Sequence, residues 1–591
     1  MSATDGVRLA VLASRIDGIV RKMTNTLFRT ARSGVVNTAR DFSCCILSAQ
    51  DELLSAAESL PIMAVCGPEL VTRFVREMHP NLRRGDAYLH NSPYHGNSHA
   101  ADHCIVVPVI DRGGAHRLSV VVKAHVGDCG NSIPSSLMAS ALDVYNEGAL
   151  IFPAVQIQRE FRDLEDVLRM CRARIRAAEL WEGDLHAMVG AARVGEHELE
   201  ALAAEIGWDG LAHFAQQWLA YGADMMAAAI GRLPPGRHTA ETVHDALPGI
   251  TGEVSIRVTV EVRPSEGVVE IDLRDNPDCL PCGMNLTEST ARATGVIGVL
   301  NAINDRVPIN AGTLSRIRVL LREGCAVGIP RHPASCSLAT THLSIRTINV
   351  VQRALAELGP DIGMAETGAD IPASGSAISG RDPRRGGERY VGLVFLGISA
   401  GAASPWADGW IGAEANTAGM MYADSIEVDE LHYPFRVWVN RVVTDSAGPG
   451  RRRGAPALHV EYEPIGAPLT AIWIADGTRH PAAGVRGGLP GSCARQFRRT
   501  RSGQLEALPA AGQVELAPGE RLVSYSTSGG GYGPPEQRDP ARVAHDVLEG
   551  WVSREAAVAV YKVALDASGE LDVSGTARLR DVDRSGGQVS G

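Results

Sequence analysis

The chain has 591 residues, of which 45% are hydrophobic and 21% are charged. These values are typical of a globular protein with roughly two to four domains. Its 57 Lys and Arg residues are outnumbered by 68 Asp and Glu residues, which gives a formal net charge of −11. This balance argues against a nucleic-acid or anionic-membrane partner, because phosphate binding needs a basic surface. With no spanning apolar stretch and no secretory pattern near Met1, we expect a cytoplasmic protein.

Hydrophobic periodicity predicts an α-rich N-terminal part. Apolar residues recur every three or four positions over 7–31, which predicts an amphipathic helix. A short β-rich stretch follows from Asp41 to about Leu54. The segment 164–232 is the most helical part of the chain, and Pro234-Pro235 closes it.

The pattern then changes to strands and turns. Residues 254–262 alternate between apolar and polar side chains, and 268–273 form the expected hairpin partner. Helical patterns return at 287–304 and 341–358, while short strands and Gly-rich turns dominate beyond 390. We therefore predict a multi-domain α+β fold with an α-rich N-terminal part and a β-rich C-terminal part. The expected divisions are 1–235, 236–440, 441–574 and a flexible tail over 575–591.

Histidines concentrate in one short region of the chain. Seven of the eighteen lie between 79 and 125, namely His79, His90, His95, His99, His103, His116 and His125. Two His-x-x-Asp elements stand out among them. The first runs from His99 to Asp102, and the second runs from His125 to Asp128.

A β-hairpin is predicted between these two elements. Two β-rich runs, 104–110 and 117–123, flank a turn at Gly113-Gly114. Antiparallel pairing brings both His-x-x-Asp elements to the open end of the hairpin. Two imidazoles and two carboxylates there would form a mixed nitrogen and oxygen site for a divalent ion such as Zn²⁺ or Mn²⁺. The alternative is a set of ordinary turn residues, with the histidines hydrogen-bonded to loop carbonyls.

Other candidate residues have simpler alternatives. Lys123 is a candidate to orient or activate a substrate carbonyl, or it simply ends the strand. Cys129 is either a nucleophile or, more simply, a buried small residue. The lone Cys279–Cys282 pair favours reduced thiols over a zinc site. The glycine run 528–533 favours a structural turn over a phosphate cradle, and no P-loop or Gly-x-Ser-x-Gly elbow is present.

Several segments in one consistent order resemble the hydantoinase B/oxoprolinase family. The matching segments span nearly the whole chain and are Asp41-Phe-Ser-Cys-Cys, Asn91-Ser-Pro-Tyr-His-Gly-Asn-Ser-His99-Ala-Ala-Asp102, Ala124-His125-Val-Gly-Asp128, Tyr145-Asn-Glu147-Gly148, Asn310-Ala-Gly312, Gly529-Gly-Gly-Tyr-Gly-Pro534 and Arg538-Asp539-Pro540. The resemblance implies one half of a two-component enzyme. Its ATP-using, hydantoinase A-type partner phosphorylates a lactam, imide or ketone oxygen, and the B-type chain hydrolyses the activated amide.

The resemblance also implies a divalent metal site. Its metal ligands correspond to Asp41, His99 and His125, with Asp102 and Asp128 as further ligands or as carboxylates that orient the histidines. Asp102 or Asp128 would then serve as general base. ATP would bind the partner chain in a hetero-oligomer, because this sequence lacks a P-loop.

Some positions depart from the family pattern. The usual Asn-Asp-Pro-Tyr reads Asn91-Ser-Pro-Tyr94, and the usual His-His pair reads His125-Val126. Segments 399–404 and 414–416 lack a Gly-rich run and a His-x-His that relatives often carry. The expected ligands are kept, while the surroundings of the substrate differ.

Three functions follow from these observations. The preferred one is a metal-dependent subunit that hydrolyses a cyclic amide such as a lactam, a hydantoin or a 5-oxoproline-like ring. The second is a subunit of a ketone carboxylase, as in the related acetone and acetophenone carboxylases. The third is a scaffold subunit without turnover.

Overall fold

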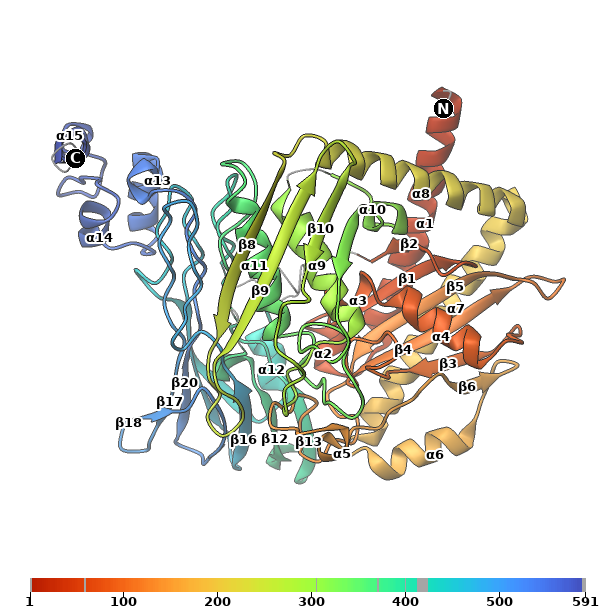
Figure 1. The fold of residues 1–591 in the computed structure, drawn as a ribbon. Helices are drawn as coiled ribbons and strands as arrows, with labels where there is room; N and C mark the ends of the chain where they lie inside the picture. Colours follow the sequence, from red (N-terminus) through yellow and green to blue (C-terminus); the bar gives the residue numbers. More distant parts are fainter. Residues whose placement is uncertain are drawn as a thin grey trace.

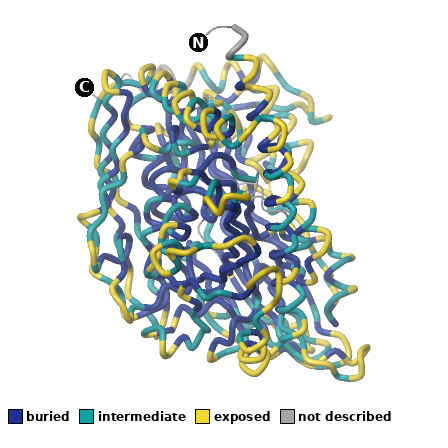
Figure 2. Tube along the Cα trace, turned by 90° about the vertical axis from the view of Figure 1, so that its right-hand side faces the viewer, coloured by how far each residue is buried: buried dark blue, intermediate teal, exposed yellow. Residues whose placement is uncertain are grey.

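The computed structural model describes residues 3–57, 60–303, 306–368, 371–398, 400–411 and 423–586. Helices and sheets are mixed, and the α+β fold class predicted from the sequence is confirmed. The two termini lie on opposite sides of the molecule (Figure 1). The buried residues concentrate in the middle of the molecule (Figure 2). No helix of the described residues is both long and apolar enough to cross a bilayer.

A seven-stranded sheet dominates the N-terminal part, in the order β2-β1-β5-β4-β3-β6-β7. The strands are β1 Phe42–Ser48, β2 Leu53–Ala56, β3 Ala87–His90, β4 Asp102–Ile110, β5 His116–His125, β6 Val155–Arg159 and β7 Arg162–Asp163. The helices of this part are α1 Ala3–Thr30, α2 Gly34–Asn37, α3 Pro61–Ala64, α4 Pro68–Met78, α5 Val144–Glu147, α6 Glu165–Arg174, α7 Ala178–Ile206 and α8 Trp208–Ile230.

Both faces of this sheet are covered. Helices α1 and α7 pack on one face, where their apolar side chains join those of β4 and β5 in one core. A second core lies on the other face, between the sheet and α4. Burial on both faces explains why β4 and β5 read as nearly continuous apolar runs. The predicted hairpin is confirmed, with β4 and β5 paired in antiparallel fashion.

The central part is a four-stranded sheet with two long helices on one face. The sheet has the order β11-β10-β9-β8. Its elements are β8 Gly236–His244, β9 Val254–Arg263, β10 Val268–Asp272, α9 Glu288–Ala302, α10 Ala311–Leu314, β11 Ile317–Leu320 and α11 Leu343–Ala356. The predicted strands 254–262 and 268–273 and the helices 287–304 and 341–358 are confirmed. Alternate residues of β9 are buried, as the period of two requires.

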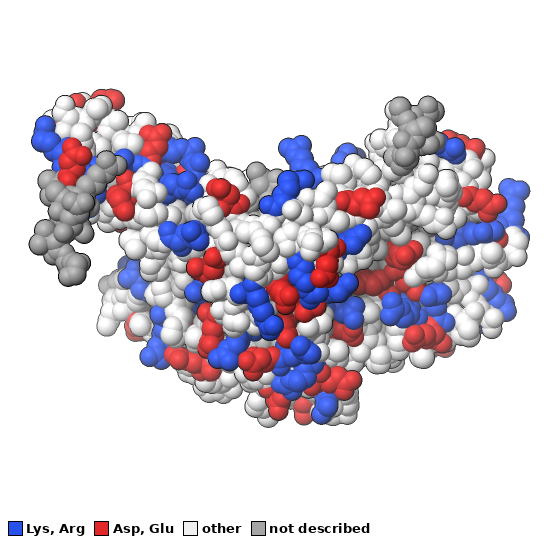
Figure 3. All heavy atoms as spheres, turned by 45° about the horizontal axis from the view of Figure 1, so that its top comes forward, with Lys and Arg blue, Asp and Glu red and all other residues white. Residues whose placement is uncertain are grey.

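The outer face of β8–β10 carries ion pairs instead of a second layer. Arg257 pairs with Glu241, and Arg263 pairs with Glu270. Figure 3 shows basic and acidic side chains interspersed over one face of the molecule. Because charges of both signs are paired on this face, it has little net positive potential to attract a polyanion.

The C-terminal part contains two further sheets, β13-β12-β16-β19 and β14-β15-β20-β17-β18. The strands are β12 Ala377–Asp382, β13 Glu388–Leu393, β14 Phe435–Val442, β15 Leu458–Pro464, β16 Leu469–Ile474, β17 Arg495–Arg499, β18 Leu505–Leu508, β19 Ala511–Leu516 and β20 Arg521–Tyr525. The helices are η1 Ala373–Gly375, η2 Pro383–Arg385, α12 Ile426–His432, η3 Pro535–Gln537, α13 Pro540–Leu548, α14 Arg554–Ala559 and α15 Val573–Gly586.

One of the two expected internal boundaries lies between two elements, and the other lies inside a strand. The boundary at 235/236 lies between α8 and β8, whereas the boundary at 440/441 falls inside β14. Strand pairing joins β12 and β13 to the C-terminal strands, so the β-rich region begins before 441. The chain is helical through Gly586 where the sequence predicts a flexible tail. Residues 587–591 and the expected departure at 414–416 lie outside the described residues.

The glycine run near the C-terminus packs backbone against backbone. A methyl group on Gly529 would lie 1.9 Å from the carbonyl oxygen of Gly401. Only glycine allows this approach. This contact supports a structural role for the run 528–533.

A buried ion network links the central and C-terminal parts. Arg346 of α11 donates to Asp476 at 2.7 Å and lies 3.4 Å from Glu366. All three side chains are almost inaccessible to solvent. A buried cation between two acids fixes the relative position of the segments that carry them.

Candidate metal centre

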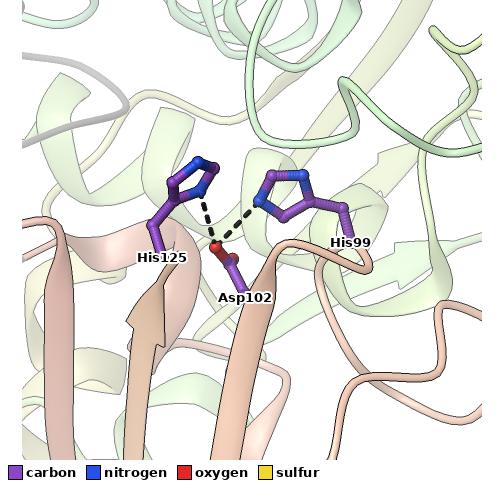
Figure 4. Close-up of side chains that lie close together, drawn as sticks. All are labelled: His99, Asp102 and His125. Carbon is purple, nitrogen blue, oxygen red and sulfur yellow. Dashed lines mark hydrogen bonds and ion pairs between the residues drawn. The ribbon is translucent and has the colours of Figure 1, made fainter. Parts of the chain in front are cut away.

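The open end of the β4–β5 hairpin positions the candidate site. Asp102 begins β4, His125 ends β5, and the two residues are directly paired in the ladder. His99 lies in the turn before β4, whose backbone is closed by a hydrogen bond from the Asp102 N–H to the His99 carbonyl. Local sequence and strand register therefore bring the three residues together (Figure 4).

Asp102 lies between the two imidazole rings. Its Oδ1 is 2.8 Å from His99 Nε2 and 3.1 Å from His125 Nδ1. One ligand atom from each residue can be chosen so that all three lie within 4.8 Å of one another. The ring centroids of the two histidines are 5.1 Å apart. This spacing is compatible with binding to a single ion at about 2 Å from each donor.

The remaining ring nitrogens have partners of their own. His99 Nδ1 donates to the carbonyl oxygen of Ser337 at 2.8 Å. His125 Nε2 forms a 2.9 Å hydrogen bond with the hydroxyl of Ser136. Such bonds set the ring orientation and the tautomer of a metal-binding histidine. Because they leave His99 Nε2 and His125 Nδ1 facing Asp102, the residues present fit a divalent ion.

Two further groups complete the surroundings of Asp102. The hydroxyl of Ser98 donates to Asp102 Oδ2. Lys123, two residues before His125 and on the same face of β5, donates to the Ser98 hydroxyl at 3.4 Å. Lys123 is only 1% exposed. A chain of hydrogen bonds therefore connects the ammonium group to the carboxylate.

Asp41 is close enough to interact electrostatically with the three residues. It precedes β1, and its carbonyl accepts the His125 N–H at 3.0 Å. Its Oδ1 is buried and has no hydrogen-bond partner among the described residues. Asp41 does not belong to the group of three residues whose ligand atoms lie within 4.8 Å of one another, but an unpartnered buried carboxylate oxygen near this group is a candidate further donor for a cation.

Burial and charge set the protonation of this cluster. Burial raises the pKa of Asp41 to about 6, and Asp102 adds to the rise while His125 and His99 oppose it. Burial would also raise the pKa of Asp102, but the two histidines hold it far below its ordinary value. Burial opposes charge on His99, yet Asp102 raises the pKa of this ring overall. Asp102 is therefore ionised, and Asp41 titrates near neutral pH.

The structure does not bring Asp128 into the three-residue cluster. Its carboxylate accepts the Arg176 N–H at 2.7 Å, the Arg176 guanidinium at 3.0 Å and the Gly130 N–H at 3.0 Å. These bonds hold the loop that follows His125 against the segment between α6 and α7. The two His-x-x-Asp elements therefore differ in role: Asp102 lies between the two histidines, whereas Asp128 holds a loop.

Most of the clustered histidines lie outside the centre. His103 accepts a hydrogen bond from Trp181, and burial lowers its pKa to about 3. His95 stacks on Phe74 at 4.1 Å, and burial lowers the pKa of His90 to about 3. His79 and His116 bond to Ala154 and Ser119, respectively. The concentration of histidines between 79 and 125 identifies the region of the candidate centre, but it does not show which histidines could bind the ion.

The cysteines serve as buried thiols. All eleven are free, and most are buried. Cys129 donates to Asn131 at 2.9 Å, and burial raises the pKa of its thiol well above the ordinary value. A neutral thiol is a poor nucleophile. The structural interpretation of Cys129 is therefore the better one.

Sequence reasoning missed the partners contributed by distant loops. Ser136 and Ser337 lie in segments without regular secondary structure, and Met138 N–H donates to the Ser337 hydroxyl at 3.0 Å. Glu147 is buried and accepts a hydrogen bond of 2.6 Å from Ser335. The central part thus supports a site whose ligands all come from the N-terminal part. No periodicity marks Ser136 or Ser337.

Residues 5–535 match the hydantoinase B/oxoprolinase family. The chain belongs to this family. Its resemblance to the family is therefore confirmed over nearly its whole length. The family assignment agrees with the placement of His99 and His125 at one centre, because both lie in motifs that carry the resemblance.

Three curated relatives and one solved structure illustrate the similarity. The chain is 29% identical to the caprolactamase beta chain of Pseudomonas jessenii, covering 98% of this chain and 99% of that protein. It is 26% identical to the B component of a putative D-/L-hydantoinase of Pseudomonas sp. (strain NS671), covering 98% of each. It is 23% identical to the acetophenone carboxylase delta subunit of Aromatoleum aromaticum, covering 98% and 89%.

The fold is similar to that of a solved relative. The crystal structure of the ATP-dependent caprolactamase from Pseudomonas jessenii aligns with a TM-score of 0.88 and 26% identity, covering 98% of this chain and 100% of that one. This hydantoinase B/oxoprolinase family member therefore shares its architecture from end to end with a known enzyme component.

Proposed function

We propose that this chain is the B-type component of an ATP-dependent amidohydrolase. Its substrate would be a cyclic amide, such as a lactam, hydantoin or 5-oxoproline-like ring, after phosphorylation by a hydantoinase A-type partner. The convergence of His99, Asp102 and His125 carries the proposal. Similarity to components of a caprolactamase and a hydantoinase supports it. The absence of a P-loop from the sequence agrees with ATP binding on the partner.

A Zn²⁺ or Mn²⁺ ion would be held by His99, Asp102 and His125, with Asp41 as a further donor. When bound, such an ion lowers the pKa of a coordinated water and polarises an oxygen of the substrate. Ser337 and Ser136 would keep the two imidazoles in the binding orientation. Asp128 would act only by holding the loop after His125.

Asp41 would bind the ion as a carboxylate, because a cation beside it favours the charged form over the neutral form that burial alone favours. Asp102 is held ionised by both histidines and is therefore a poor proton acceptor. Lys123, whose ammonium group donates to the Ser98 hydroxyl, would orient an oxygen of the substrate.

The chemistry requires two water molecules. Phosphorylation of the amide oxygen removes the resonance that makes an amide inert. The first water adds to the ring carbon, the C–N bond breaks, and the nitrogen takes up a proton, which leaves an amino acyl phosphate. The second water converts this acyl phosphate to a carboxylate and free phosphate. The complete reaction consumes one ATP and opens the ring.

Turnover measured with separate components tests this proposal. Candidate lactams and hydantoins are incubated with this chain, with and without the A-type partner and ATP. We expect ring-opened product only in the complete mixture, and a loss of at least about a thousandfold for His99→Ala. Product without ATP, or an undiminished rate with His99→Ala, would contradict the proposal.

Carboxylation is the second candidate, because the acetophenone carboxylase delta subunit aligns over almost all of this chain. Labelled bicarbonate would enter the product of a carboxylase and not that of a hydrolase. The scaffold alternative predicts no stoichiometric divalent ion after purification from metal-replete medium. Metal analysis therefore distinguishes it from both enzymatic functions.

A further inference from the structure

The five-stranded sheet of the C-terminal part has two different faces. One face supplies Val460, Tyr462 and Leu522 to a buried hydrophobic core. Because side chains alternate along a strand, their neighbours in the sequence lie on the opposite face, which we call the outer face. The outer face carries five arginines and two glutamates, which are Arg436, Arg441, Glu461, Glu463, Arg495, Arg499 and Arg521. This local excess of positive charge contrasts with the net charge of −11 of the whole chain.

Both glutamates of the outer face are already paired. Arg499 donates to Glu461 at 2.7 Å, while Arg521 lies 3.5 Å from Glu461 and 3.3 Å from Glu463. The pairs therefore account for two of the five arginines and for both acids.

The other three arginines of the outer face lack an acidic partner. Arg436, Arg441 and Arg495 are exposed, and no carboxylate of the residues that the structure describes lies within 4 Å of their guanidinium nitrogens. Three guanidinium groups thus remain available to a binding partner. In Figure 1, β17, β18 and β20 of this sheet lie along one side of the molecule.

An exposed tryptophan lies between these charges. Trp438 is 48% exposed and lies at a β-bulge of β14, where Val437 and Val439 are paired with consecutive residues of β15. The guanidinium carbons of Arg436 and Arg521 lie 5.9 and 4.2 Å from the centroid of its ring. Cation–π contacts of this kind hold the arginines in place while their N–H groups stay free to donate.

A second aromatic group spans the neighbouring strands. His459 of β15 stacks on Tyr525 of β20, with 4.3 Å between the ring centroids. Arg495 lies 5.0 Å above the Tyr525 ring, and Arg441 donates to His459 Nδ1 at 3.4 Å. The free guanidinium groups are therefore positioned by aromatic rings instead of by acids.

This combination of side chains fits an acidic peptide segment. A guanidinium group can donate two parallel hydrogen bonds to one carboxylate. Tryptophan and arginine are also the side chains that most often dominate the binding energy of protein interfaces. A nucleic acid fits less well, because its affinity depends on neutralising many phosphates and the chain as a whole is acidic.

The dimensions of the outer face also favour a segment over a whole subunit surface. Five strands about 4.8 Å apart and about 17 Å long give a face of roughly 300 Å². A stable interface buries about 800 Å² on each partner, so this face would be one part of a larger contact. A two-fold contact with a second copy would place the same three unpaired guanidinium groups against one another.

We propose that the outer face of the sheet β14-β15-β20-β17-β18 binds an acidic segment of the A-type partner. Arg436, Arg441 and Arg495 bind carboxylates of this segment, and Trp438 packs against its apolar atoms. The inference rests on the proposed function, which requires such a partner. The similarity of this chain to components of a caprolactamase and a hydantoinase supports the need for an interface of this kind.

Binding of the full-length chain to the purified A-type partner tests this surface. Surface plasmon resonance compares the wild type with Trp438→Ala and with a triple variant that carries Arg436→Glu, Arg441→Glu and Arg495→Glu. We expect about ten- to a hundredfold weaker binding for Trp438→Ala and at least about a hundredfold for the triple variant. The affinity of the triple variant should also depend less on salt. Arg112→Glu, an exposed arginine in the β4–β5 turn, is the matched control and should bind like the wild type.

The outcomes separate this surface from the proposed function. Wild-type affinity in both variants, with melting curves that show folded protein, would overturn the surface and leave the proposed function intact. Dimers of this chain alone, or binding to single-stranded DNA, that the triple variant abolishes would assign the face to another occupant and overturn the proposal. A complex that depends on this face but opens no cyclic amide would refute only the proposed function. Failure of the wild type to bind the A-type partner would refute both.

Discussion

Asp102 and His125 face each other across the β4–β5 ladder, with Asp102 Oδ1 lying 3.1 Å from His125 Nδ1. Strand register alone creates this pair. Asp102 begins β4, His125 ends β5, and the two strands are paired in antiparallel fashion along their length. His99 then joins the pair through the short turn before β4. The candidate centre therefore rests on one of the most buried hairpins of the protein.

Replacement of either histidine should remove the metal ion. We expect His99→Ala and His125→Ala to lower the affinity for Zn²⁺ or Mn²⁺ by more than about a hundredfold, because each removes a donor. Elemental analysis of purified protein checks this result. His186→Ala, on the surface of α7, serves as the control. A full equivalent of metal in both variants would refute the assigned ligands.

Ser136→Ala should lower the affinity for the metal ion without removing a donor atom. The Ser136 hydroxyl bonds to His125 Nε2 at 2.9 Å, so its loss frees the ring to rotate. The expected effect is about a ten- to hundredfold lower affinity at unchanged stoichiometry. A competition titration with a chelating dye measures it. Ser379→Ala in β12 is the control, and equal affinities for the two variants would contradict the prediction.

Asp128→Asn should affect stability more than metal content. The substitution weakens the bonds to Arg176 and Gly130, and we expect a loss of about 1–3 kcal/mol in the free energy of unfolding. Urea denaturation measures the loss, and elemental analysis should still find one ion per chain. Arg176→Met should resemble it. Loss of the ion from Asp128→Asn in the folded protein would instead restore Asp128 as a ligand.

Asp424 and Asp429 should make stability depend on pH. Burial and the charge of Asp424 raise the pKa of Asp429 to about 8, and burial raises the pKa of Asp424 to about 6. Unfolded Asp titrates near 3.9. Between about pH 4 and 8 the folded protein keeps protons that the unfolded chain has lost, so stability falls as pH rises.

Asp429→Asn should flatten this dependence. Unfolding free energies measured in urea at pH 5, 6, 7 and 8 should decrease less in the variant than in the wild type. Glu427→Gln in the same helix is the control, because Glu427 is exposed. Parallel curves for the wild type and Asp429→Asn would show that the carboxyl pair does not titrate in this window.

Short-range patterns predicted many of the elements correctly. The helix over 7–31, the strands 254–262 and 268–273, and the hairpin around Gly113-Gly114 follow from spacing alone, and the structure confirms them. The expected boundary at 440/441 falls inside β14, and β12 pairs with β16, which follows much later in the chain. Pairing between distant strands leaves no signal in a local pattern.

The sequence by itself determined the family, the hairpin and the meeting of His99, Asp102 and His125. These depend on residue identity and on the two-residue period of a strand, which are both local properties. Only the tertiary structure separated Asp128 from these three residues and showed that it holds a loop. It alone also placed Ser136 and Ser337 next to the two histidines. Those contacts join residues up to 238 positions apart, and packing, not spacing along the chain, selects them.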